Sequence, residues 1–296
     1  MIQISEFKDS YGIDRTVYSE TFPTITDLVE TVSTRELSPN LMDYVKESYD
    51  FIASDFDISN PSFYGVKTSK EGRDKALFGL APKSMTQRLK QYRREIELTQ
   101  KGPTMCDEFL PIGGILSIPK YLSQSPTPYY VLYEEEQEIK TISIAVDMWT
   151  NADISAKKMA DACECIMAVL TKLEVQGWSV GLTITNTGEA SGNWYSVGAE
   201  IKKVSDELEV NRIYQMIGTP IFQRVISWGW RARNPYWVSY YTSSSQPYLT
   251  GDDRLRFYQE TYQVDKVFRL MDVINELSWS TPESVQDWLV EQLTGN

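Results

Sequence analysis

The 296-residue chain contains no histidine. Histidine is the commonest general base, the usual partner of a catalytic serine or cysteine, and the commonest side-chain ligand of transition metals. Its absence argues against most nucleophilic and transition-metal active sites, although carboxylates, lysine or a magnesium ion held by oxygen atoms could still support chemistry. We therefore predict that the protein is not an enzyme and that it carries no cofactor.

Cysteine is also scarce, and the three examples are Cys106, Cys163 and Cys165. So few cysteines fit a reducing compartment better than a framework of disulfides. Cys163 and Cys165 lie two positions apart on a predicted helix, where side chains point in different directions, so they are poorly placed to share a metal ion. We expect Cys163 to be buried, as free cysteines usually are.

Long apolar runs are missing as well. No run approaches the ~20 residues that a helix needs to span a bilayer. The amino-terminal segment MIQISEFKDSYGIDR lacks the basic start and the apolar stretch of a signal peptide. We therefore expect no contact with a membrane and a location in the cytoplasm.

Acidic residues outnumber basic residues, 41 to 29, which gives a net charge of −12. Such a chain should be soluble and should not coat duplex DNA indiscriminately. The charge is uneven, because residues 67–101 hold ten basic and four acidic residues. A helix predicted within this segment carries Arg88, Lys90, Arg93 and Arg94 around an apolar stripe. This basic surface is either a solvated helix face or a binding surface for a partner.

The middle of the chain has the clearest pattern. The short apolar run Ile142–Val146 predicts a central strand that ends at Asp147. A long amphipathic helix follows, capped by Asp153 or Ser155, and Gly177 should end this helix before a second strand. Parallel sheets present their working groups at the carboxyl ends of their strands, so Asp147 marks the place where chemistry is most expected.

The other elements are predicted from hydrophobic periodicity and from end signals. Helices are expected at residues 24–32, 41–53, 69–80 and 208–227, the last interrupted near 218–220, and from 281 onward. Strands are expected at 129–133, at 194–204 and shortly before the final helix. The acidic turn at 134–138 should join two strands as a hairpin, and residues 187–193 and 242–253 are expected to be loops.

A buried strand that ends in aspartate, followed by a loop and a long helix, resembles the start of a von Willebrand factor A-type domain. More specifically, the chain resembles an uncharacterised family of tailed-phage proteins that carry a degenerate domain of this kind. The resembling segments lie in the same order over roughly residues 60–293 and include IAVDMWTNADISAKKMADACECIMAVLTKLEVQGWSVGLTI and EIKKVSDELEVNRIYQMIGTPIFQRVISWGW. The resemblance implies a viral origin and a Rossmann-like sheet flanked by helices, and it implies no reaction.

The resemblance also draws attention to the loop after Asp147. Working metal sites of the broader fold use Asp-x-Ser-x-Ser at this place, completed by a threonine and an aspartate from later loops. In this chain Trp149 replaces the first serine, where its indole would obstruct an ion, and Thr150 is out of phase. Asn151 could still ligate through its carbonyl oxygen. We expect a degenerate site without a metal, in which Asp147 caps the next helix or bonds to the loop.

The densest aromatic segment, residues 228–241, interleaves arginine with tryptophan and tyrosine. This composition is typical of single-strand binding, where bases stack on rings and guanidinium groups contact phosphates. It is equally typical of protein–protein hot spots and of buried cores, so these alternatives stay open. The candidate binding residues of this aromatic tract are Trp228, Trp230, Arg231, Arg233, Tyr236 and Trp237.

Together the patterns and the resemblance predict an α/β protein with a Rossmann-like, von Willebrand A-like and mostly parallel sheet flanked by helices. Residues 1–104 would form an N-terminal, mainly helical region, and residues 105–296 the von Willebrand A-like domain.

Our functional hypothesis is a phage-encoded, non-enzymatic recognition protein in the host cytoplasm. It would be an accessory factor in viral nucleic-acid transactions that binds single-stranded DNA or recruits a polymerase, through the basic helix and the aromatic tract. The alternative is a protein-only role, as an assembly partner from phage or host or as an inhibitor of a host defence enzyme. The acidic balance favours this alternative, because a negative surface can compete for a basic DNA-binding site.

Overall fold

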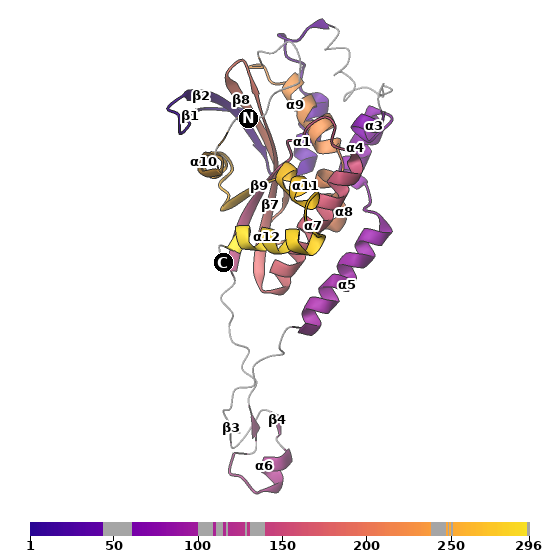
Figure 1. Cartoon of the computed structure of the whole chain (residues 1–296), viewed down its shortest axis with the longest axis vertical. Coiled ribbons are helices and arrows are strands. Elements are labelled where there is room, and N and C mark those ends of the chain that lie inside the picture. The colour runs from indigo at the N-terminus through magenta and orange to yellow at the C-terminus, as the bar shows by residue number, and fades with distance from the viewer. Residues whose placement is uncertain are drawn as a thin grey trace.

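A six-stranded mixed sheet organises the protein, which Figure 1 shows as a computed structural model. Its strands are β1 (Gln3–Lys8), β2 (Asp14–Phe22), β8 (Asn193–Lys202), β7 (Trp178–Ala190), β6 (Lys140–Asp147) and β9 (Lys266–Arg269), in that spatial order. The pairs β1/β2 and β7/β8 are antiparallel, whereas β2/β8, β6/β7 and β6/β9 are parallel. The predicted α/β class is confirmed, and the sheet is mixed where we expected a mostly parallel one.

The structure describes residues 1–43, 61–99, 109–110, 115–116, 118–127, 129–130, 140–237, 247, 249 and 251–294. Helices in the first half of the chain are α1 (Ile25–Thr34), α3 (Pro61–Tyr64), α4 (Ser69–Phe78), α5 (Lys83–Thr99) and α6 (Ile118–Leu122). Those in the second half are α7 (Ala156–Val175), α8 (Val210–Ile217), the π-helix η2 (Phe222–Ile226), α9 (Ser227–Ala232), α10 (Gly251–Tyr262), α11 (Leu270–Leu277) and α12 (Pro282–Thr294). A separate three-stranded sheet has the order β3 (Phe109–Leu110), β5 (Tyr129–Tyr130) and β4 (Ile115–Leu116).

The strand–helix–strand unit predicted in the middle of the chain is present as β6, α7 and β7. β6 and β7 are adjacent and parallel, and Asp147, the last residue of β6, lies opposite Thr185 of β7. Ser155 is the residue that caps α7, because its side chain accepts a hydrogen bond from the main-chain N–H of Lys158. Gly177 takes the left-handed conformation (φ 84°) that ends the helix and turns the chain into β7.

One face of the sheet carries most of the apolar core. Ile144 and Val146 of β6 and Leu182 and Ile184 of β7 point to this face and are fully or almost fully buried. α7 packs on them and also contacts α5, α8, α11 and α12. Cys163 on α7 is completely buried, as expected, and burial raises the pKa of its thiol. This face is therefore closed by helices along the length of α7.

The opposite face is covered by α10, which lies on the other side of the sheet from α7 and α8 in Figure 1. Trp194 of β8 and Phe7 of β1 meet Phe257 of α10 with ring centroids 5.4 and 5.5 Å away. Gly198 of β8 lies directly under the ring of Tyr262, so that a Cβ atom at this position would clash with the ring. α10 depends on this close approach to reach the sheet.

Three expectations are corrected by the structure. The first 22 residues form β1 and β2 of the main sheet, so the N-terminal region does not begin as a helical extension. Residues 187–193 are mostly strand, because Ser191 and Gly192 both have positive φ angles (52° and 79°) and make a tight hairpin between β7 and β8. Residues 251–253 open α10 instead of ending a polar loop.

Several predictions fall outside the described residues. These are most of the helix at 41–53, the acidic turn at 134–138, and Cys106. The helices predicted at 24–32 and 69–80 are confirmed as α1 and α4, and the interruption near 218–220 separates α8 from η2. Within the described part of the chain, no helix is both long and apolar enough to span a membrane.

Candidate functional site

A pocket of about 220 Å³ opens at the carboxyl end of β6, beside β7, on the same face of the sheet as α9 and η2. We call it the carboxyl-edge pocket. One side of the pocket comes from the loop Trp149–Ala152, which follows β6, and from Asn186 of β7. The other side comes from Gln223, Arg224, Trp228 and Arg231. Ligands of open α/β sheets bind at this edge, because strand ends and the loops after them leave a crevice there.

Arg224 forms one part of the pocket floor and is 2% exposed. Its guanidinium group donates hydrogen bonds to the main-chain oxygen atoms of Phe63 (2.7 Å) and Ile154 (2.9 Å). Longer bonds reach the oxygen atoms of Asn151 and Ala152, at 3.4 and 3.5 Å. Burial lowers the pKa of this guanidinium group. Arg224 thus fixes the loop after β6 and places a positive charge under the pocket.

A second set of buried polar groups completes the floor. Arg231 donates a short hydrogen bond to the Oδ1 atom of Asn186. Gln223 donates to the main-chain oxygen of Thr150 at 2.8 Å, and the hydroxyl of Thr150 donates to Gln223 Oε1 at 2.7 Å. The Nδ2 atom of Asn186 is buried and has no hydrogen-bond partner within the described residues. An unsatisfied buried donor of this kind is costly and calls for a ligand or a structural reason.

The rim of the pocket is aromatic, formed by the half-buried side chains of Phe63, Trp149 and Trp228. The ring centroids of Phe63 and Trp228 are 5.9 Å apart, with 42° between the ring planes. The guanidinium group of Arg224 lies 4.2 Å from the centroid of Phe63. The pocket therefore joins half-buried aromatic rings at its mouth to buried arginine and amide side chains at its base.

Asp147 lies on the other face of the sheet and does not line the pocket. It is 3% exposed, accepts a hydrogen bond from the main-chain N–H of Trp149 at 3.2 Å, and is bonded by Tyr258 of α10. Burial raises the pKa of its carboxyl group to about 6, against the lowering effect of these bonds and of Arg254 and Arg269. Asp147 thus helps to hold the loop that carries Trp149, as we expected of a residue bonded to that loop.

Asp147, Trp149 and Asn151 are the residues of the degenerate metal site that the sequence predicts. The structure separates these residues, because Trp149 and Asn151 line the pocket while Asp147 points to α10. No group of three or more histidine, cysteine or acidic residues that could hold a metal ion occurs in the part of the chain that the structure describes.

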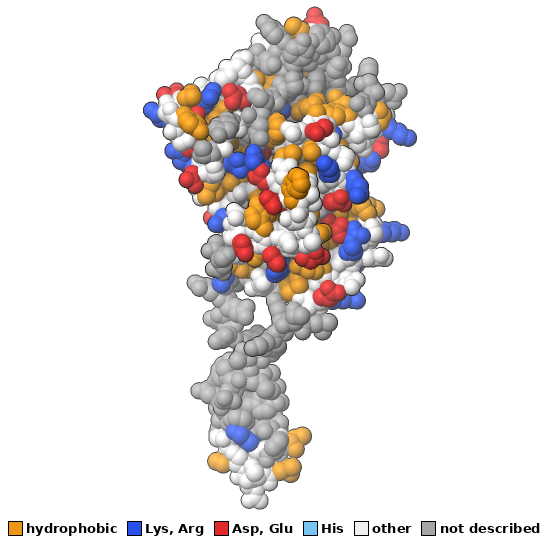
Figure 2. Space-filling model, in the orientation of Figure 1, with side chains coloured by type: hydrophobic (Ala, Val, Ile, Leu, Met, Phe, Trp, Pro, Cys, Tyr) orange, Lys and Arg blue, Asp and Glu red, His pale blue; other side chains and the backbone are white. Residues whose placement is uncertain are grey.

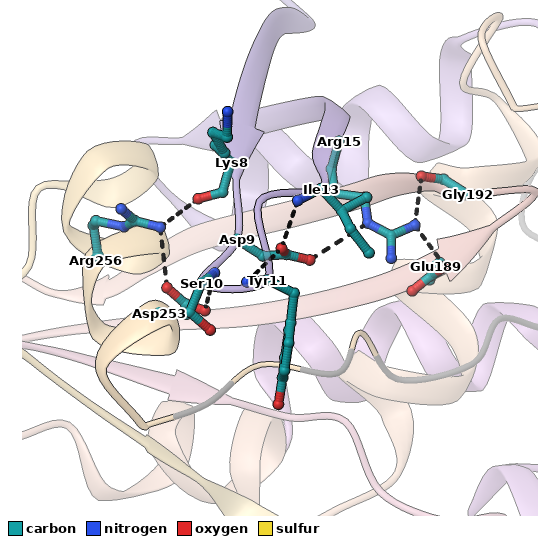
Figure 3. A network of polar contacts seen from close by, with 10 residues as sticks. All are labelled: Lys8, Asp9, Ser10, Tyr11, Ile13, Arg15, Glu189, Gly192, Asp253 and Arg256. Carbon is teal, nitrogen blue, oxygen red and sulfur yellow. Dashed lines mark hydrogen bonds and ion pairs between the residues drawn. The ribbon is translucent and has the colours of Figure 1, made fainter.

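A polar network fastens the start of α10 to the β1–β2 hairpin (Figure 3). Asp253 in the first turn of α10 accepts a hydrogen bond from the N–H of Ser10 at 2.7 Å, and it pairs with Arg256 at 3.0 Å. Arg256 also donates to the main-chain oxygen of Lys8. Beside it, Asp9 accepts the N–H groups of the β1–β2 turn. This network holds α10 over Asp147 and is structural.

The aromatic tract is mostly interior. Trp230, Arg231, Arg233 and Trp237 are each at most 2% exposed, so they cannot offer their side chains to a nucleic-acid strand at the surface. Trp228 reaches the rim of the carboxyl-edge pocket and Arg231 its floor, whereas Tyr236 is 42% exposed and stacks on Tyr18 with centroids 5.0 Å apart. The candidate residues of this tract are therefore split between core and pocket.

Trp230 has a specific structural partner. Its Nε1 atom donates to Glu20 Oε2 at 2.8 Å, and Arg35 donates two further hydrogen bonds to the same carboxylate, each at 2.7 Å. The amino terminus pairs with Glu20 at 2.9 Å. Burial raises the pKa of Glu20, but the bonds from Arg35, the amino terminus and Trp230 outweigh it and lower the pKa to about 2.

The basic helix predicted around residue 90 is α5. Arg88, Lys90, Arg93 and Arg94 are all exposed, and Figure 2 shows Lys and Arg side chains along the side of the molecule where α4 and α5 lie, mixed with acidic ones. Arg88 is engaged by Glu164 of α7 through two hydrogen bonds. α5 therefore presents basic groups to solvent, and one of them serves to attach the helix to α7.

Sequence patterns did not single out Phe63, Asn186, Gln223 or Arg224 as site residues. Gln223 and Arg224 follow the predicted interruption near Pro220, where a missing N–H group leads to the π-helix η2, and π-helices often occur at functional sites. This irregularity was the available signal for them. Phe63 and Asn186 had none, because they meet the pocket only through long-range packing.

Comparison with protein families gives a match over most of the chain. No curated protein and no solved structure matches the chain. Residues 6–273 match the family described as "Domain of unknown function (DUF7192)". The matched region contains both sides of the carboxyl-edge pocket, α10 and every strand of the main sheet, apart from the start of β1. The chain belongs to the DUF7192 family.

Proposed function

We propose that the protein is a non-enzymatic recognition protein that binds single-stranded nucleic acid and takes one unpaired base into the carboxyl-edge pocket. The observation that carries this proposal is the combination of an aromatic rim with a buried, arginine-containing floor at the ligand-binding edge of the sheet. Bases stack on aromatic side chains whatever their sequence, and guanidinium groups attract the accompanying negative charge. The exposed basic residues of α5 would contact phosphates away from the pocket.

The size and charge of the pocket support a small ring as the ligand. Its volume of about 220 Å³ is below the ~300–1,000 Å³ of typical ligand pockets, so it suits one base and not an extended molecule. Arg224 and Arg231 lie at its base, and no acidic residue lines it among the described residues. The net charge of −12 repels nucleic acid from most of the surface, so binding would depend on the local positive charge of this pocket and of α5.

We place this activity in viral nucleic-acid transactions, as an accessory factor that binds single-stranded DNA or recruits a polymerase in the host cytoplasm. The viral setting and the von Willebrand A-like character of the core rest on the resemblance of the sequence. The β6–α7–β7 unit with Asp147 at the end of its first strand supports the latter.

The test is oligonucleotide binding by the full chain, measured by fluorescence anisotropy with a labelled oligothymidine at low and high salt. Trp228→Ala and Trp149→Ala should each weaken binding by ~1–3 kcal/mol, the contribution of one stacked ring. This equals a roughly 5- to 150-fold higher Kd. Trp279→Ala is the matched control, because Trp279 is 90% exposed and lies outside the pocket. Absence of binding at low salt, or equal losses in all three variants, would contradict the proposal.

One observation favours the protein-binding alternative. Ile118, Tyr121 and Leu122 of α6 are 64%, 59% and 74% exposed, which is unusual for neighbouring apolar side chains. Such a cluster suits a host or phage protein, as an assembly partner or as a defence enzyme to be inhibited. Affinity purification from infected cells with the wild type and with a Tyr121→Asp variant would test it, since a true partner should be lost with the variant alone.

A further inference from the structure

We propose that two copies of the chain associate through the outer edge of β1. The two β1 strands would run antiparallel about a twofold axis at Ile4, so that the two main sheets become one continuous sheet. β1 lies at one end of the strand order and has a neighbour on one side only (Figure 1). This pairing is independent of the ligand of the carboxyl-edge pocket.

The outer main-chain groups of β1 are unused. The N–H of Asp9 donates to the oxygen of Ile13 at 3.1 Å, in register with the pairing of β1 and β2. Because antiparallel strands bond through alternate residues, the odd-numbered residues of β1 bond to β2, and the N–H and C=O groups of Ile4 and Glu6 point outward. No hydrogen bond within the described part of the chain reaches these outward groups. They form a template for another strand.

The edge lacks the features that keep edge strands single. Natural proteins shorten such strands, interrupt them with a bulge or a proline, or place charges along them. β1 has six residues, contains no proline and pairs with β2 without a break in register. Its charged residues, Glu6 and Lys8, both lie in its second half. At the other end of the sheet, β9 has four residues and leads directly into α11.

An apolar row crosses the sheet and ends at this edge. The strand registers place Tyr195 of β8 beside Tyr18 of β2, and Tyr18 beside Ile4 of β1. The two tyrosine rings stack with centroids 5.1 Å apart. Tyr195 is fully buried and Tyr18 half-buried, whereas Ile4 is 55% exposed. A second copy paired at Ile4 would continue the row with the same three side chains in reverse order.

Charge selects the register of the pair. With the axis at Ile4, each Ile4 faces its counterpart and each Glu6 faces Ile2, so the two Glu6 residues lie ~14 Å apart along the strands. Moving the axis toward Glu6 brings the two carboxylates together, and like charges directly opposite each other destabilise a strand pair. A shift further toward the turn meets the guanidinium group of Arg256, which donates to the outward oxygen of Lys8. The edge is therefore complementary to itself about Ile4, and such a twofold contact closes at two copies.

The experiment measures the mass of the full wild-type chain in solution by sedimentation velocity, in about 0.15 M salt to screen the net charge. The wild type should be a dimer. Ile4→Pro removes an N–H group that the chain's own sheet does not use, and Ile4→Lys places two like charges at the axis, so both variants should be monomers. Trp279→Lys is the matched control and should remain a dimer, because Trp279 is 90% exposed but lies between α11 and α12.

A wild type that stays monomeric at its highest soluble concentration would overturn the proposal. So would a dimer that persists in Ile4→Lys, since the interface would then lie elsewhere. If circular dichroism shows that Ile4→Pro does not fold, Ile4→Lys decides. Ile4→Cys tests the register, because the two Cα atoms would lie ~5.5 Å apart, within the range of a disulfide. Under mild oxidation it should form a covalent dimer, and no more cross-linking than in the wild type would overturn the axis at Ile4.

Discussion

The buried carboxyl group of Asp147 should make the protein less stable as the pH rises from about 4 to about 6. Its pKa is about 6 in the folded protein, against 3.8 for an ordinary aspartate, chiefly because burial disfavours the charge. Between these values the folded state binds more protons than the unfolded state, so the free energy of unfolding falls with rising pH. A difference of about two pKa units corresponds to ~3 kcal/mol.

The groups that face Asp147 limit this cost. Tyr258 and Arg254 approach from α10 and Arg269 from β9, and Asp272 of α11 pairs with both arginines. The two arginines therefore stabilise the charged carboxylate only in part, because Asp272 shares them. The variant Asp147→Asn should remove the pH dependence in this window, and its amide oxygen can still accept the N–H of the following loop.

The measurement is urea unfolding followed by circular dichroism at intervals from pH 4 to pH 8, for the wild type and Asp147→Asn. The free energy of unfolding of the variant, relative to the wild type, should rise by up to ~3 kcal/mol between pH 4 and pH 7. Asp14→Asn is the control, since Asp14 is exposed and should leave the profile unchanged in shape. Parallel profiles for the wild type and Asp147→Asn would refute the reasoning.

Three further perturbations have defined outcomes. Burial raises the pKa of Glu20, but its hydrogen bonds outweigh burial and lower the pKa from 4.5 to about 2. Glu20→Gln should therefore lower the free energy of unfolding by about 3 kcal/mol at pH 7, and this loss should vanish as the pH falls from 4.5 to 2. Denaturant unfolding measures this, and a constant difference across that range would contradict it. Gly198→Ala should lower the free energy of unfolding by roughly 1–3 kcal/mol, because the added Cβ atom would press on the ring of Tyr262. Thermal unfolding measures this effect, and an unchanged Tm would show that α10 does not pack so closely on β8. In the oligonucleotide assay, replacing Lys90 and Arg94 together by alanine should reduce the slope of log K against log salt by ~0.7 for each phosphate that is no longer neutralised, while an unchanged slope would remove α5 from the binding surface.

The parts of the fold that were predicted correctly have strong local signals. The β6–α7–β7 unit combines an apolar strand, a serine cap and a left-handed glycine, and each of these acts over a few residues. α10 was missed because its sequence, GDDRLRFYQETY, is rich in charge and begins within a polar stretch. Phe257, Tyr258 and Tyr262 lie at helical spacing, and they are buried only because β1, β2 and β8 provide the surface beneath them.

The site was less predictable than the fold. The arginines of residues 224–233 are buried, and bonds to the loop after β6, to Asn186 or to nearby main-chain oxygen atoms compensate their charge. The loop after β6 and Asn186 lie far from these arginines in sequence. The composition of the tract therefore could not show that its arginines are buried, and it predicted an exposed binding surface instead. The sequence predicts for Trp149 only that its indole would obstruct a metal ion. Its position on the pocket rim depends on how Asp147 holds the loop, which no sequence spacing describes.

The order of strands has a consequence for synthesis of the chain on the ribosome. β2 pairs with β1 and with β8, and Val17 is matched to Trp194, so the first hairpin emerges long before the strand that joins it to the sheet. Until β8 has left the exit tunnel, β2 has an unpaired edge that could associate with other nascent chains. Closing this long-range pairing is an entropically demanding step, and it should set the folding rate of the whole domain.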